Sequence, residues 1–237
     1  MLKRTAENAV WLSRYRVRIE LLSRLIILHY ENLLDRPRPS GDPESLSEGI
    51  ECWLPCLLAA GIEEPEALTP ATGGGLHVLI GADEVNSNAL LSLIQQLHTN
   101  LRCCRDFLPQ EIFDTLSQLC LQASQSLSMG GDAHLLIAIL RELELQIMTI
   151  NGQIEQRMAH NHVYLFLKAG ELIERADLAT RVLEMTEDAA FRDAPVLSLV
   201  ADSDNRGKNN SGSGTTRDNT TQKSTRSALS RQSIRSL

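Results

Sequence analysis

Aliphatic residues recur at spacings of three, four and seven along most of this chain, and this period limits its fold more than any other feature. Between residues 5 and 34 the apolar positions include Trp11, Tyr15, Leu22 and Leu25, which fall on one side of a helix. Aromatic residues account for only 4% of the chain, so the core must consist of Leu, Ile, Val and Ala. That composition favours helices packed through aliphatic stripes over a β-sandwich.

The same spacing, read together with the glycines and prolines, predicts an all-α bundle of about six helices. The predicted helices cover residues 5–34, 45–60, 84–107, 112–126, 135–150 and 162–190. Residues 61–82 contain three consecutive glycines and are predicted to be a loop, although the apolar residues 76–80 fit either a helical turn or an extended segment. Asn151 and Gly152 are expected to end the fifth helix.

Composition divides the chain into a helical domain, residues 1–190, and a polar, basic tail, residues 191–237. Almost no apolar residue occurs between residues 201 and 227, so the tail is predicted to be disordered. The chain has 16 basic and 27 acidic residues before Pro195, and seven basic and three acidic residues from there onward. The acidic domain argues against nucleic-acid binding, except for a weak contact through the tail.

Several classes of protein are excluded by missing signals. Five cysteines without a Cys-x-x-Cys pair, together with an N-terminus that lacks a signal sequence, predict a soluble cytoplasmic protein. No apolar run is long enough to cross a membrane. His160 and His162 lack a further ligand at metal-binding spacing, and the glycine run lacks the ending of a phosphate loop. We therefore predict neither a metal nor another cofactor.

Two of the predicted helices carry the same charged pattern, arginine–x–acid–x–x–x–arginine. The residues are Arg18, Glu20 and Arg24 in the first helix, and Arg175, Asp177 and Arg181 in the last. The two helices align without a gap, which predicts an internal pseudo-repeat whose first and last helices pack together. Within each helix we expect an ion pair between residues four apart, Glu20 with Arg24 and Asp177 with Arg181.

Glu174 lies on nearly the same helical face as Arg181, and Val17 takes the equivalent place in the first helix. The favoured interpretation is a partly buried ionic network that fixes the register of the two helices. The alternative is an anion or substrate pocket, in which the four arginines bind the ligand and Glu174 acts as general acid or base. No other residue is a candidate for catalysis.

Three stretches resemble the alpha-E family, a bacterial all-helical family named for its Glu-Arg motif. They are residues 1–15, residues 170–181 and the middle segment 86–106, and the resemblance spans roughly residues 1–186. Glu174 and Arg175 form an intact motif, whereas Val17 replaces the first glutamate and His98 and Thr99 stand where the family usually has Arg and Glu. Because family members usually continue further, the chain resembles a divergent, C-terminally shortened member.

This resemblance implies a companion of circularly permuted ATP-grasp ligases and transglutaminase-like peptidases, in systems that make or process small peptides. We expect a non-catalytic accessory subunit that binds the ligase or its peptide-like substrate. Two alternatives remain open: a small helical enzyme acting on an anionic or amide-bearing substrate through Glu174 and the arginines, and a degraded paralogue that retains only the fold. Because the chain is shorter than other family members, we also predict that two copies pair into a homodimer. The tail is either native or the product of truncation or frameshift.

Overall fold

The computed structural model describes residues 3–35, 51–62, 74–81 and 87–187, and these form an all-α fold, as predicted. They contain seven α-helices rather than six. The helices are α1 (Lys3–Asp35), α3 (Leu54–Ala59), α4 (Gly75–Ile80), α5 (Leu90–Cys103), α6 (Gln110–Ser128), α7 (Ala133–Arg157) and α8 (His162–Glu187), with 3-10 turns η1 (Glu51–Trp53) and η4 (Arg105–Phe107). The predicted tail, 191–237, and the start of the predicted second helix, 45–50, lie outside the described residues.

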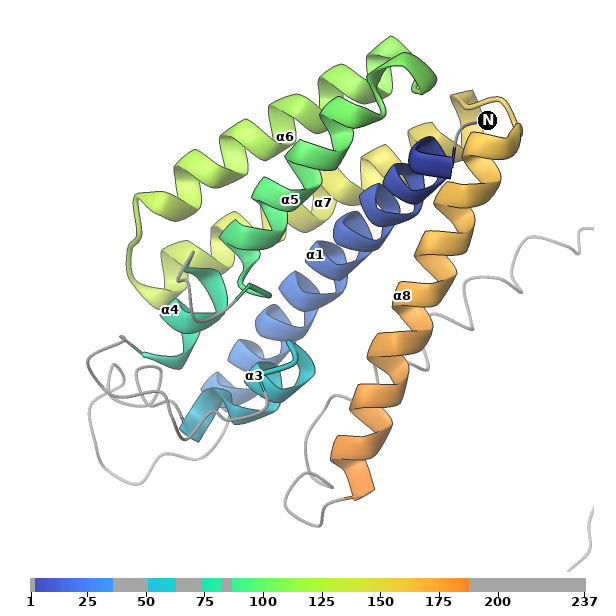
Figure 1. Cartoon of the computed structure of the whole chain (residues 1–237). Helices are drawn as coiled ribbons and strands as arrows, with labels where there is room; N and C mark the ends of the chain where they lie inside the picture. Colours follow the sequence, from blue (N-terminus) through green and yellow to red (C-terminus); the bar gives the residue numbers. More distant parts are fainter. Residues whose placement is uncertain (1–2, 36–50, 63–73, 82–86, 188–237) are drawn as a thin grey trace, which may run out of the picture.

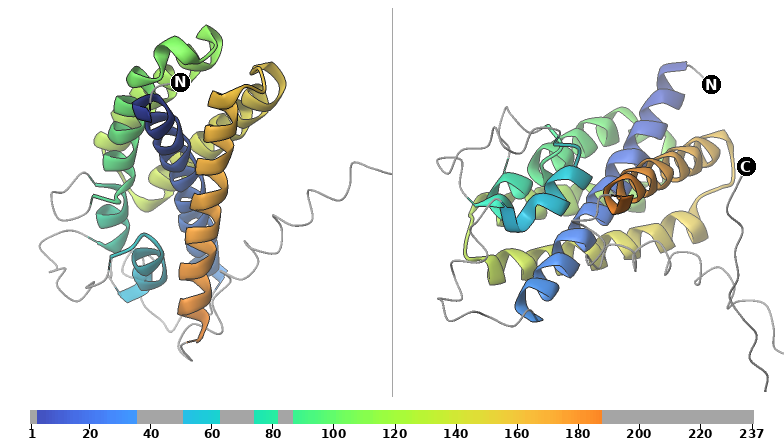
Figure 2. Two further views of the ribbon diagram at one scale, coloured as in Figure 1. Left: turned by 45° about the vertical axis from the view of Figure 1, so that its right-hand side comes forward. Right: turned by 90° about the horizontal axis from the view of Figure 1, so that it is seen from below.

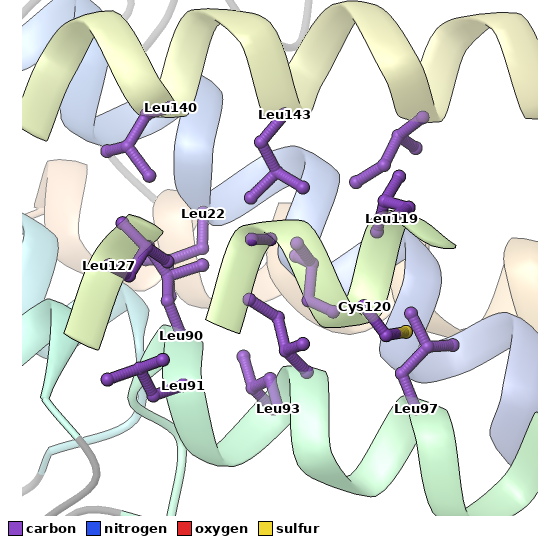
Figure 3. Close-up of a cluster of buried hydrophobic side chains, with 14 of the residues drawn as sticks. Leu22, Leu90, Leu91, Leu93, Leu97, Leu119, Cys120, Leu127, Leu140 and Leu143 are labelled. Carbon is purple, nitrogen blue, oxygen red and sulfur yellow. The ribbon is translucent and has the colours of Figure 1, made fainter. Parts of the chain in front are cut away.

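Helix α1 runs through the middle of the molecule (Figure 1). It packs against α5 and α7, which in turn pack against α6, so these four helices enclose one aliphatic core. Leucines from all four helices meet there, including Leu22, Leu97, Leu119 and Leu143, and each is almost completely buried (Figure 3). The scarcity of aromatic residues is therefore compensated by dense packing of leucine and isoleucine.

Within the predicted loop, 61–82, the described residues 75–80 form a short helix, α4. The prediction of a loop is wrong there, and the apolar residues 76–80 take the helical turn and not the extended segment. The apolar residues of α4 are buried against α3 and α5. The helix starts at Gly75, where a Cβ atom would lie 2.6 Å from the Cβ of Trp53. Trp53 is fully buried and packs against the ring of His29 in α1, at 5.3 Å between centroids. The consecutive glycines thus include one that a close packing contact requires, and they do not prevent a helix.

The predicted break at Asn151 and Gly152 is also wrong, because α7 continues to Arg157. An Asn-Gly pair is typical of a helix end, but here the side-chain amide of Asn151 has a partner in another helix. It donates to Glu20 Oε2 of α1 at 3.0 Å. The turn comes later, where Asn161 Oδ1 accepts from two backbone N–H groups in the first turn of α8, at 2.9 and 3.2 Å.

Helices α1 and α8 lie side by side and run in the same direction (Figures 1 and 2). Gly170 makes their close approach possible, because a methyl group there would overlap the backbone carbonyl of Val10. Side-chain contacts between the two helices join residues 155 to 160 positions apart. Arg18 and Arg175, which the pseudo-repeat aligns, therefore lie at about the same level. The prediction that the first and last helices pack together is confirmed.

Candidate functional site

Glu174 lies in the contact between α1 and α8, with only 2% of its surface exposed. Its two carboxylate oxygens are held by two different arginines of α1: Arg14 Nε donates to Oε2 at 2.8 Å, and Arg18 Nε donates to Oε1. The guanidinium of Arg14 also lies over the ring of Trp11, 4.6 Å from its centroid. Charge-assisted hydrogen bonds of this kind offset the cost of burying a carboxylate.

Arg18 connects Glu174 to two further polar residues, Asn88 and Asp177. Its Nη1 donates to Asn88 Oδ1 at 3.2 Å, and its Nη2 lies 3.9 Å from Asp177 Oδ2. Asp177 Oδ2 also pairs with Arg181 Nη2 at 3.1 Å. The predicted pair between Asp177 and Arg181 is therefore confirmed, and Arg18 couples it to Glu174.

A small cavity of about 20 Å³ lies beside Glu174, between α1, α3 and α8. Arg18, Asn88, Asp177 and Arg181 provide its polar lining. A space of this size holds about one water molecule, and it is too small for a peptide, a sugar or a nucleotide. Of the side chains that predicted an anion pocket, Arg18, Arg181 and Glu174 meet here and fill the space among themselves, whereas Arg24 and Arg175 do not line this cavity.

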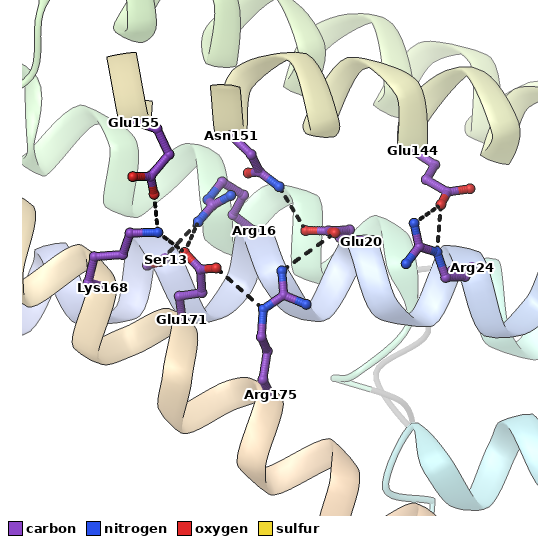
Figure 4. A network of polar contacts seen from close by, with 10 residues as sticks. All are labelled: Ser13, Arg16, Glu20, Arg24, Glu144, Asn151, Glu155, Lys168, Glu171 and Arg175. Carbon is purple, nitrogen blue, oxygen red and sulfur yellow. Dashed lines mark hydrogen bonds and ion pairs between the residues drawn. The ribbon is translucent and has the colours of Figure 1, made fainter. Parts of the chain in front are cut away.

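A second ionic network lies on the other flank of the same contact, facing α7 (Figure 4). Arg175 Nη2 is 3.7 Å from Glu20 Oε1, and its Nε is 3.3 Å from Glu171 Oε1. Arg16 Nη2 lies 3.4 Å from Glu171 Oε2. With the amide of Asn151 bound to Glu20, the network joins three helices, so it fixes their mutual register.

The electrostatics of this second network are set by burial and by mutual neutralisation. Burial lowers the pKa of the Arg16 guanidinium, and Glu171 and Glu20 offset part of that effect. Burial alone would raise the pKa of Glu171, but Arg16, Lys168 and Arg175 together hold it below the usual carboxyl value. Lys168 Nζ is 3.2 Å from Glu171 and also pairs with Glu155. Glu171 is thus the anion on which three cations converge.

Arg24 takes no part in either cluster. Its Nε and Nη2 atoms both contact Glu144 Oε1 of α7 at 2.7 Å. The predicted pair between Glu20 and Arg24 is therefore wrong, because the partners of both residues lie on helices other than α1. Burial of Glu20 between α1, α7 and α8 makes contacts across helices possible that spacing along one helix does not reveal.

Sequence reasoning missed Arg14 and Glu171, although both are central. They occupy equivalent positions when Arg18 is aligned on Arg175, and they carry opposite charges. Arg14 contacts Glu174, and Glu171 contacts Arg16, so each motif helix supplies an ion to the other. Opposite charges at aligned positions of the two helices could therefore have predicted ion pairs between them. Val17, between the two flanks, is fully buried and needs no partner.

Clusters of metal-ligating side chains and buried thiols are two other features of the described residues that bear on chemistry. No group of three His, Cys, Asp or Glu side chains there is placed to hold a metal. Burial raises the pKa of the Cys104 thiol to about 11 and that of Cys120 to about 12, and it raises that of Cys56 further. Thiols with such pKa values are poor nucleophiles. In the same residues no helix is long and apolar enough to cross a membrane.

A larger hollow, of about 490 Å³, lies between α6 and α7 on the outer side of the bundle. Its floor is apolar, formed by Ala123, Ile139 and Leu143. Polar side chains stand around it, among them Gln122 and Gln146. This hollow is larger than the space beside Glu174, and it is an open groove on the surface that does not enclose a ligand.

The chain was compared with known proteins and families. Searches of curated proteins and of solved structures gave no match. The model of the Alpha-E family, described as a predicted alpha-helical domain with a conserved ER motif, matches residues 1–206. The match covers α1, which holds Arg14 and Arg18, and α8, which holds the pair Glu174 and Arg175. The chain therefore belongs to the Alpha-E family.

Proposed function

We propose that this chain is a non-catalytic helical accessory subunit of a circularly permuted ATP-grasp-type ligase system, and that it binds the ligase or its peptide-like substrate. The non-catalytic part of this proposal rests on the contacts of the Glu174 carboxylate. Both of its oxygens are bound by arginines, and the adjoining cavity has room for about one water. A general acid or base needs a free oxygen within reach of a substrate proton.

The hollow between α6 and α7 supports a role in holding a peptide-like ligand. Gln122 and Gln146 each offer a donor and an acceptor above an apolar floor, which is the combination that pairs with peptide groups. Gln146 already donates to Glu142 Oε1 at 2.9 Å, which orients its amide. The ligase itself is proposed from the family resemblance.

The experiment is co-expression of the full chain with a circularly permuted ATP-grasp-type ligase from the same organism. We expect the two proteins to co-purify and the chain to change ligase turnover. Replacing Gln122 and Gln146 together by Ala should remove the effect on turnover, while Gln110→Ala, at an exposed position of α6 outside the hollow, should not. Absence of both co-purification and any change in turnover would refute the proposal.

Glu174→Gln separates the accessory role from the rival, a small enzyme. If the role is non-catalytic, this variant loses thermal stability and still co-purifies with the ligase. If instead the purified chain alone converts an anionic or amide-bearing substrate, and Glu174→Gln abolishes that turnover while remaining folded, the chain is an enzyme.

A further inference from the structure

Helix α8 is apolar on two opposite sides. Its inner side, which includes Val163, Leu167 and Val182, is buried. Its outer side carries Leu172, which is 66% exposed, with Leu165, Phe166 and Ile173 also exposed. A contiguous apolar surface of this kind on a helix is normally covered by another element. Among the described helices, α1 and α3 pack on α8, and neither covers this outer side (Figure 2).

The outer side has a regular composition, and we call it the α8 stripe. It consists of Leu165, Phe166, Ala169, Leu172, Ile173, Ala176, Ala179 and Thr180. Thr180 directs its hydroxyl to the backbone oxygen of Ala176 at 3.0 Å, so its polar group is satisfied within the helix. The residues recur at spacings of three and four over roughly 22 Å, which is the pattern of a helix that packs against another helix.

The α8 stripe is also symmetric about its own midpoint, between Leu172 and Ile173. When the order of these eight residues is reversed, each falls on another of the eight, whereas Leu183, which is exposed on the same side one turn further along, falls on His162. Two copies in antiparallel orientation would therefore place Leu172 opposite Ile173, Ala169 opposite Ala176, and Phe166 opposite Ala179. Small residues then face small or large ones, as close packing requires, and one surface serves both partners of a two-fold contact.

We propose that the α8 stripe is the interface of an antiparallel homodimer, in which α8 of one copy packs on α8 of the second. At the edge of the stripe, Lys168 and Arg175 are already paired with Glu155 and Glu171, so they bring no unpaired charge to the contact. The chain that follows α8 contains Phe191 and the apolar residues Val196, Leu197, Leu199 and Val200, but Pro195 interrupts it and few apolar residues follow residue 201. It is the competing occupant that the labelling test below distinguishes. This inference does not depend on the proposed function.

The first test is the molecular mass of the full chain by sedimentation velocity at increasing protein concentration. We expect the wild-type chain to be a dimer. Leu172→Glu should raise the dimer dissociation constant at least about 100-fold, since each two-fold contact would bury two unpaired carboxylates. Leu145→Glu is the matched control, because Leu145 of α7 is 59% exposed and lies outside the stripe, and it should leave the dimer unchanged.

The second test fixes the orientation, in a Cys103→Ser background that removes the exposed native thiol. Leu165→Cys mixed with Thr180→Cys should form an intermolecular disulfide, and neither variant should do so alone. Disulfides between two Leu165→Cys chains would show parallel packing and overturn the arrangement.

A wild-type chain that stays monomeric at high micromolar concentration would overturn the proposal altogether. In that case, slow labelling of Leu172→Cys would mean that residues 188–237 of the same chain cover the stripe. Fast labelling would mean that the stripe is open. A dimer that Leu172→Glu leaves intact would also overturn the proposal.

Discussion

Replacing Glu174 by Gln removes the anion that binds Arg14 and Arg18 while keeping almost the same volume. Breaking a buried ion pair costs about 3–5 kcal/mol, because the partner charges stay behind uncompensated. Here the side chains of Arg14 and Arg18 are 20% and 21% exposed, so water recovers part of that cost. We therefore expect a loss of about 2–3 kcal/mol in the free energy of unfolding. For a domain of this size the melting temperature should fall by roughly 5–10 °C.

The assay is thermal and urea unfolding followed by circular dichroism at neutral pH. Asp177→Asn is the control, since Asp177 is 37% exposed and 3.9 Å from Arg18, and it should cost less than about 1 kcal/mol. Replacing Glu174, Arg14 and Arg18 together by leucine or methionine should restore much of the stability lost in the single variant. The reasoning is refuted if Glu174→Gln is no more destabilising than Asp177→Asn.

Three further predictions concern packing, thiols and acid. Gly170→Ala should destabilise the protein by about 2–4 kcal/mol in urea unfolding, because the methyl group would separate α8 from α1. Gly152→Ala in α7 is the control: the space around Gly152 is open, so this variant should stabilise the protein by about 0.5–1 kcal/mol. In the native protein an aromatic disulfide reagent should label the exposed thiol of Cys103 rapidly, and it should reach the three buried thiols only on unfolding. The pKa of Glu171 is lower in the folded than in the unfolded state, which means that its ionised form stabilises the fold. Its contribution to the free energy of unfolding should therefore be complete above about pH 5 and lost as the pH falls below about 4. The loss of stability in acid should be smaller in Glu171→Gln, and an equal loss in that variant would contradict the assignment.

The sequence alone determined the all-helical class, the approximate extent of α5, α6 and α8, and the pairing of α1 with α8. The helices follow from residue spacing, because apolar residues that recur every three to four positions lie on one side of an α-helix. The pairing follows from the repeated charges, which mark helices in equivalent places. The family was also visible in residues 170–181. Local signals failed where a tertiary partner overrides them, as at Asn151, whose amide binds Glu20 of another helix and lets α7 continue.

Spacing along α8 predicted the pair of Asp177 with Arg181, but only the tertiary structure decided which charges meet across helices. Spacing along a single helix predicted that Glu20 pairs with Arg24. Glu20 instead contacts Asn151 of α7 and Arg175 of α8, and Arg24 contacts Glu144 of α7, because three helices converge at this level. Arg14 and Glu171 became visible only when α1 and α8 were placed side by side. The tertiary structure likewise filled the space beside Glu174. A sequence lists the charged groups, whereas packing decides whether they bind a ligand or one another.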